Sequence, residues 1–126
     1  MNAIVAVAVG GALGAVLRHG VNIGAVKMLG HGFPYGTLIV NILGSFLMGA
    51  LITVMAHSWQ ASDTVRFFLV TGLLGAFTTF STFSLDAVTL WERKDYLQTA
   101  LYMGGSVALS IAALVLAMFI VRTVVS

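Results

Sequence analysis

The chain has no cysteine, one proline and four acidic residues among its 126 residues, and these scarcities exclude several classes of protein. Without cysteine there is no disulfide framework, no thiol nucleophile and no thiolate metal site. Charged residues make up 8% of the chain, whereas a soluble globular domain has about 25%. Because 60% of the residues are hydrophobic, the composition indicates an integral membrane protein.

Enzyme signatures are also missing. The sequence contains no GxxxxGK[ST] or HExxH motif, and its three histidines lie near the ends of apolar spans. No serine, histidine and aspartate are placed where they could plausibly converge. The net charge of +2 is too small and too scattered for a nucleic-acid-binding surface. We therefore expect neither an enzyme nor a nucleic-acid partner.

The charged residues separate four apolar spans, at about residues 3–26, 35–56, 64–90 and 96–121. Each is long enough to cross a bilayer as a helix, which takes about 20 residues. The first lacks the basic flank of a signal peptide, so we expect a retained helix. Pro34 suits the start of the second helix, and Ser62 with Asp63 suits an N-cap of the third. The sequence predicts an all-α membrane protein with a single four-helix domain over residues 1–126.

The third span contains a run of hydroxyl groups. Residues 78–84 read TTFSTFS, five hydroxyls and two phenylalanines inside an uncharged, membrane-length stretch. Serine and threonine can hydrogen-bond the backbone themselves and so compete with regular helix. Polar or irregular backbone at membrane depth survives only where it is buried in protein or lines a cavity. We therefore expect this run, including Thr79, Ser81 and Thr82, to line a pathway.

Two further polar side chains lie within the first two spans. Arg18 lies about one helical turn past the middle of its span, where a basic residue costs about 2.5–3.5 kcal/mol. We favour a structural role, with a carbonyl or a helix C-terminus as its partner, over direct contact with a permeant anion. Its charge would still favour anions nearby. Asn41 either joins two helices by a hydrogen bond or donates to a ligand, and both roles stay open.

Hydroxyl and aromatic side chains recur at helical spacing. Tyr102, Ser106 and Ser110 are four residues apart, which places three hydroxyls along one face of the fourth helix. Phe80 and Phe83 are three residues apart and share a face if that stretch is helical. Aromatic ring edges are positive and can meet an anion, although core packing is the usual role of such a pair. The neighbouring hydroxyls favour the pathway role.

Acidic residues are nearly absent from the spans. No carboxylate precedes Asp63, and Asp86, near the end of its span, is the only other acid within one. Proton-coupled transport usually needs an intramembrane acid or histidine, and a cation pore needs acids or a carbonyl filter. Donors without acids indicate a path for anions.

Glycines and loop charges bear on assembly. Small residues are spaced four apart at Gly10 and Gly14, Gly20 and Gly24, and Ser45 and Gly49. This spacing lets membrane helices approach closely, and we expect it to serve an oligomer. The basic residues near the span ends are almost balanced between the two sides, with Arg66 and Arg122 on one and Lys27, Arg93 and Lys94 on the other. Charge bias therefore specifies the orientation only weakly.

The sequence resembles a known family, the small bacterial fluoride channels (Fluc or CrcB). Three blocks carry the resemblance, GALGAVLR at 11–18, GTLIVN at 36–41, and TGLLGAF at 71–77 running into TTFSTFS. It covers essentially the whole chain, and the second and third blocks are highly specific.

The resemblance implies a passive fluoride exporter in the bacterial inner membrane that reduces fluoride toxicity. It implies an antiparallel, dual-topology homodimer with two pores and a third helix broken near its middle. Phe80 and Phe83 would present ring edges to fluoride, and Asn41 and Ser110 would be polar pore contacts, with Tyr102 and Ser106 continuing the track. A structural sodium ion at the dimer interface would bind backbone carbonyls, by position those of Gly75 and Thr78.

Two positions depart from the family pattern. Asp86 replaces an expected glutamate, and Ala76 stands where many members have a second glycine; we expect neither to touch the pore residues. Two other functions stay open. A proton-coupled small drug exporter would need a glutamate in the first helix, where this chain has no acid, and a non-transporting membrane subunit would use its polar residues only to join helices.

Overall fold

The computed structural model describes residues 2–125, which contain helices and no strand. The elements are α1 (Ala3–Leu29), α2 (Tyr35–His57), α3 (Asp63–Arg66), the π-helix η1 (Phe67–Leu74), α4 (Gly75–Phe77), α5 (Ser81–Glu92) and α6 (Tyr96–Val125). Four stretches are long and apolar enough to cross a membrane, namely α1, α2, α6 and the third segment, Asp63–Glu92. The all-helical, four-span prediction is confirmed.

The first and last helices continue a few residues beyond the predicted spans, each past a basic residue. The first helix continues past Lys27 to Leu29, and Gly30 caps it with a φ of 83°, a conformation that glycine adopts without strain. The last helix continues past Arg122 to Val125. A positive charge in the last turn stabilises the helix dipole, so it accompanies a helix end without terminating the helix.

The start of the third segment agrees with the sequence. The Ser62 side chain accepts a hydrogen bond from the Val65 amide at 3.3 Å, as expected of an N-cap. Beyond α3 the chain forms the π-helix η1 and the single turn α4. Thr78 then takes an extended conformation with φ −88° and ψ 160°, and α5 begins at Ser81. Residues 78–80 thus connect two helical pieces in the middle of an apolar span. The π-helix just before this connection has a geometry that is frequent at functional sites.

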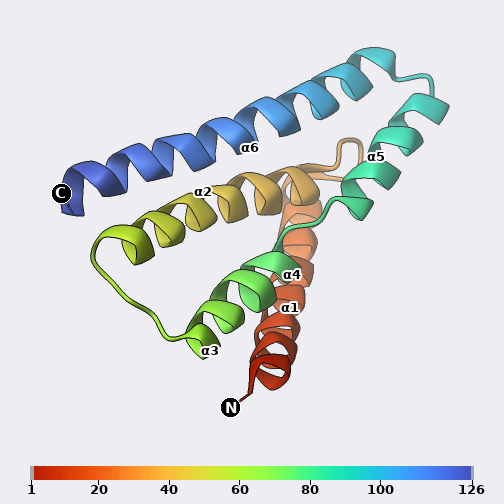
Figure 1. Cartoon of the computed structure of the whole chain (residues 1–126). Coiled ribbons are helices and arrows are strands. Elements are labelled where there is room, and N and C mark those ends of the chain that lie inside the picture. Colours follow the sequence, from red (N-terminus) through yellow and green to blue (C-terminus); the bar gives the residue numbers. More distant parts are fainter. Residues whose placement is uncertain (1, 126) are drawn as a thin grey trace.

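The spans pack as two pairs (Figure 1). Helix α2 lies along α6, and α1 lies along η1 and α4. Gly49 of α2 sits directly against the backbone of Leu114, where a Cβ atom would collide. Gly10 and Gly14 of α1 are likewise buried against the backbone of the third segment. These glycines therefore permit packing within one chain, contrary to their expected use in assembly, because only glycine lets helix backbones approach so closely.

The other predicted glycine pair has a different environment. A Cβ atom added at Gly20 or Gly24 would meet nothing within 4 Å. Among the predicted pairs of α1, this one is left free for a partner outside the chain.

The buried core lies where α5 meets α6 beneath the α1–α2 loop. Phe83, Ala87, Leu90 and Tyr102 form a cluster, with Phe33 and Leu38 packed against it. Tyr102 is fully buried, at 0% exposure. Its ring meets Phe33 edge-on at 5.5 Å and Phe83 at 5.2 Å between centroids. This cluster fixes the position of α5 relative to the other helices.

Candidate functional site

Asn41 and Thr79 join α2 to the connection between α4 and α5. The Thr79 amide donates to Asn41 Oδ1 at 2.8 Å, and Asn41 Nδ2 donates to the Thr79 carbonyl at 3.0 Å. One asparagine thereby satisfies both backbone groups of a residue outside regular helix, as membrane burial requires. Of the two roles left open for Asn41, the structure shows hydrogen bonding within the protein, although to the connection between α4 and α5 and not to another helix. Its amide nitrogen carries two hydrogens, so one donor remains for other use.

Near the same connection, two backbone amides donate to side chains and not to the carbonyls four residues before them. The amide four residues after Gly75 is that of Thr79, which donates to Asn41. The amide four residues after Thr78 is that of Thr82, which donates to Thr79 Oγ1 at 3.3 Å. The carbonyls of Gly75 and Thr78 are thus released from the usual helical pattern. Within residues 2–125, no cluster of three or more His, Cys, Asp or Glu side chains could hold a metal ion.

A cavity of about 350 Å³ lies beside this connection. Its lining comes from α2, α5, α6 and the residues between α4 and α5. The lining residues are Asn41, Gly44, Ser45, Met48, Thr78, Thr79, Phe80, Phe83, Ser106, Val107, Ser110, Ile111 and Leu114. We call it the first cavity. It brings together six of the residues predicted for the pathway, from spans that are far apart in sequence.

Two serines of α6 give the first cavity its polar character. The hydroxyl oxygens of Ser106 and Ser110 are buried and have no hydrogen-bond partner within residues 2–125. A serine hydroxyl can donate one hydrogen bond, and leaving it unmade in a buried place costs about 1–3 kcal/mol. No acidic residue is in the cavity lining. The cavity therefore offers donors to a ligand that accepts hydrogen bonds.

Phe80 and Phe83 both line the first cavity, but their environments differ. Their ring centroids are 5.6 Å apart with the planes at 45°. Phe83 is 8% exposed and belongs to the core, whereas Phe80 is 78% exposed. The first cavity is thus closed by the chain at Phe83 and open at Phe80.

Tyr102 lies outside the first cavity lining. Its hydroxyl donates to Asp86 Oδ2 at 3.0 Å. The expectation that Asp86 would touch no predicted pathway residue is therefore wrong. The two residues are 16 apart in sequence, and only the packing of α5 against α6 reveals the pair. Because a tyrosine has one hydroxyl hydrogen, this donor is committed to the carboxylate.

A second cavity, of about 340 Å³, lies beneath the α1–α2 loop. Its lining comes from α1, the following loop, the start of α2, and α5 with its C-terminal turn. The lining residues are Asn22, Ala25, Val26, Gly30, His31, Phe33, Pro34, Tyr35, Gly36, Thr37, Thr82, Asp86, Thr89, Leu90 and Arg93. Of the predicted pathway residues, it contains Thr82 alone.

The remaining predicted site residues lie apart from both cavities. Ser81 is exposed, and Gly75 is exposed on the outside of α4. Arg18 lies on α1 and lines neither cavity. Its buried Nε atom has no partner within residues 2–125, so the expected carbonyl partner is not found for that atom.

Several lining residues of the first cavity were not predicted. Gly44 and Ser45 follow Asn41 by three and four residues, which is the spacing of one helix face. This spacing alone could have predicted that Gly44 and Ser45 lie on the same side of the helix as Asn41. A Cβ atom at Gly44 would collide with the side chain of Thr78, so this glycine makes room for the connection. Met48 continues the same face.

Comparison with known proteins identifies the family. The family described as CrcB-like protein, Camphor Resistance (CrcB), matches residues 5–118. A protein of Cereibacter sphaeroides named Fluoride-specific ion channel FluC is 51% identical over 122 residues, covering 97% of this chain and 96% of that protein. Proteins with the same name from Nitrobacter winogradskyi and a Ruegeria species are 50% identical (96% of each chain) and 53% identical (95% and 94%). The chain therefore belongs to the CrcB-like family.

Proposed function

We propose that this protein is a passive, fluoride-selective channel through which cytoplasmic fluoride leaves the cell, reducing fluoride toxicity. Family membership and relatives named as fluoride-specific ion channels support this function. The observation that carries it is the first cavity, whose lining combines two unpartnered serine hydroxyls with two phenylalanine rings and no acid. Such a lining favours a small anion, and the protein has no need of catalytic groups.

Fluoride would exchange its water shell for fixed groups along the first cavity. The hydroxyls of Ser106 and Ser110 and the second amide hydrogen of Asn41 are donors in reach of an ion there. The ring edges of Phe80 and Phe83 are positive and add contacts that need no hydrogen-bond donor. Thr79 and Thr82 contribute hydroxyls near the connection. In contrast, Tyr102 would position Asp86 and the core rather than donate to the ion.

An antiparallel homodimer would complete the site. Phe80 is 78% exposed and leaves the first cavity open, so a second copy packed there would close it and create two pores. The open face at Gly20 and Gly24 suits close contact between helices. Nearly balanced loop charges fit insertion in both orientations. We place this multi-pass dimer in the bacterial inner membrane.

A structural sodium ion fits the break in the third span. The carbonyls of Gly75 and Thr78 are released from the helical pattern because Thr79 and Thr82 donate elsewhere. Hard cations prefer oxygen ligands, and in a dimer two copies would supply four such oxygens. Bound sodium would be coordinated by these carbonyls and would hold the two copies in register.

The test is fluoride efflux from liposomes that contain only the purified protein. We expect fluoride to leave rapidly while chloride, in matched liposomes, is retained, because a narrow path of fixed donors must replace the hydration of the permeating ion. Comparable chloride flux would contradict the proposed selectivity. Absence of fluoride flux from folded protein would favour a non-transporting subunit, and drug-dependent proton flux would favour the exporter.

A further inference from the structure

We propose that the second cavity is an anion-collecting mouth of the fluoride pathway, and that the guanidinium of Arg93 draws fluoride into it. The proposal rests on the channel function above and extends it to a cavity that contains only one of the predicted pathway residues. It gives Arg93 the role of an electrostatic determinant of anion entry.

The two cavities follow one another along the same helices. On α2, Thr37 lines the second cavity and Asn41, one turn further, lines the first. On α5, Phe83 lines the first cavity and Asp86, one turn further, lines the second. The rings of Phe83 and Tyr102, tilted at 40° to each other, lie near this transition. The two cavities are therefore neighbours along both α2 and α5.

Asp86 presents an electrostatic problem for such an ion. Its carboxylate lines the second cavity and would repel fluoride. Arg93 is seven residues further along, about 10 Å along the helix axis at 1.5 Å per residue, and it lines the same cavity. Among the residues lining this cavity within the described chain, it is the one side chain with a permanent positive charge. Arg93 thus offsets Asp86 at the outer end of the cavity.

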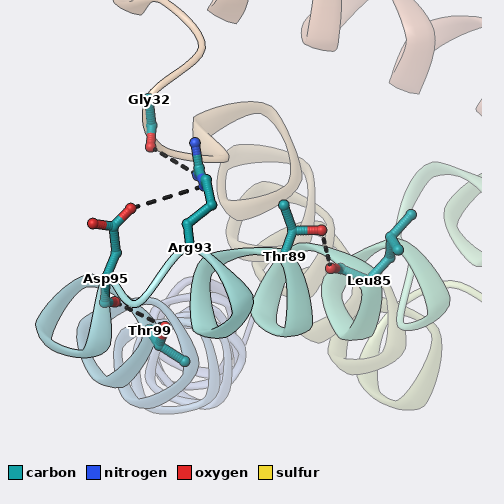
Figure 2. A network of polar contacts seen from close by, with 6 residues as sticks. All are labelled: Gly32, Leu85, Thr89, Arg93, Asp95 and Thr99. Carbon is teal, nitrogen blue, oxygen red and sulfur yellow. Dashed lines mark hydrogen bonds and ion pairs between the residues drawn. The ribbon is translucent and has the colours of Figure 1, made fainter.

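Two contacts hold the guanidinium of Arg93 (Figure 2). Arg93 donates from a terminal nitrogen to the Gly32 carbonyl at 3.4 Å, which links the turn after α5 to the α1–α2 loop. Its Nε atom lies 3.8 Å from Asp95 Oδ2, with the two side chains 47% and 43% exposed. The guanidinium is therefore placed by two contacts and still open to ions in solution, and Asp95 weakens its field.

The expected effect is moderate and depends on salt. Over about 10 Å, one unit charge changes the local concentration of a monovalent ion by about two- to seventeenfold, for dielectric constants between water and a protein surface. The Debye length is about 30 Å at 0.01 M ionic strength and about 3 Å at 1 M, so high salt removes the effect. A mouth charge changes how readily the path fills, and leaves the rate of a filled path unaltered.

The experiment measures fluoride efflux against fluoride concentration for Arg93→Gln, with ionic strength set by salts of an impermeant organic anion. At low ionic strength we expect the concentration for half-maximal flux to rise by about two- to seventeenfold, with the maximal rate retained. At about 1 M the variant should match the unmodified protein. Asp95→Asn should shift the half-maximal concentration the other way.

Two further variants separate charge from structure. Lys94→Gln removes the same charge from the next residue, which does not line the cavity, and should have a smaller effect than Arg93→Gln. Arg93→Lys keeps the charge and should behave like the unmodified protein. Equal effects at positions 93 and 94, or a loss of flux that persists in high salt and in Arg93→Lys, would overturn the proposal. Absence of fluoride flux in the unmodified protein would instead overturn the channel function itself.

Discussion

Replacing Phe80 and Phe83 one at a time by leucine separates conduction from packing, because the two rings differ so much in exposure. Phe80 is 78% exposed and Phe83 is 8% exposed. A large apolar exchange that roughly keeps volume costs at most about 1.5 kcal/mol when the side chain is buried. Scaled by burial, Phe80→Leu should cost about 0.3 kcal/mol within one chain, whereas Phe83→Leu should cost about 1.5 kcal/mol. A loss of flux in Phe80→Leu therefore cannot come from lost packing within the chain.

The loss of flux follows from the ring edge. If a ring edge contributes as much to an anion as it does to a second aromatic ring, about 0.5–1.5 kcal/mol, its loss corresponds to about a two- to tenfold change in rate. Leucine has no positive rim, so each variant should slow fluoride efflux by at least this factor. The assay is efflux from liposomes, normalised to correctly folded protein on a sizing column.

A matched control is available on α6. Phe119 is 64% exposed and lines neither cavity, so Phe119→Leu makes the same chemical change away from the site. We expect it to leave efflux unaltered. Flux near that of the unmodified protein in both Phe80→Leu and Phe83→Leu would refute the ring-edge reasoning and return both residues to a packing role.

Three further predictions concern assembly and the polar contacts. A cysteine at Glu92 would be the only thiol in the chain, and an impermeant reagent should label it from both sides of the membrane; labelling from one side alone would contradict dual topology. Asn41→Leu removes both hydrogen bonds to Thr79, so thermal unfolding in detergent should show a loss of about 2–4 kcal/mol, and an unaltered unfolding temperature would contradict this. Tyr102→Phe removes the hydroxyl that donates to Asp86 and should destabilise by about 1.5–3 kcal/mol, while fluoride selectivity is retained; loss of selectivity would instead make the hydroxyl a pore contact.

The four spans were predictable from sequence because hydropathy is a local property. A helix that crosses lipid needs a continuous apolar stretch, and that stretch is visible without knowing its neighbours. The N-cap at Ser62 was found for the same reason, since a cap involves residues only three apart. The helices continue beyond the predicted spans to Leu29 and Val125, because charge marks the membrane boundary while backbone geometry ends the helix.

The glycine pairs show where local reasoning stops. Spacing alone gives Gly10 and Gly14 the same signature as Gly20 and Gly24. In the structure the first pair is buried against the third span and the second pair faces open space. In a membrane protein the lipid-facing and protein-facing sides are equally apolar, so hydropathy does not say which face of a helix packs.

The sequence by itself determined the membrane class, the four spans and the chemistry of the site, a set of donors and aromatic edges with few acids. Which of these groups meet was decided by the tertiary structure alone. Asn41 and Thr79 are 38 residues apart, and Arg93 and Gly32 are 61 apart. Hydrogen bonds over such separations depend on how whole helices pack, and the order of residues along the chain does not show that packing. For this reason the sequence placed Tyr102 in the polar track, while the packing of α5 against α6 directs its hydroxyl to Asp86.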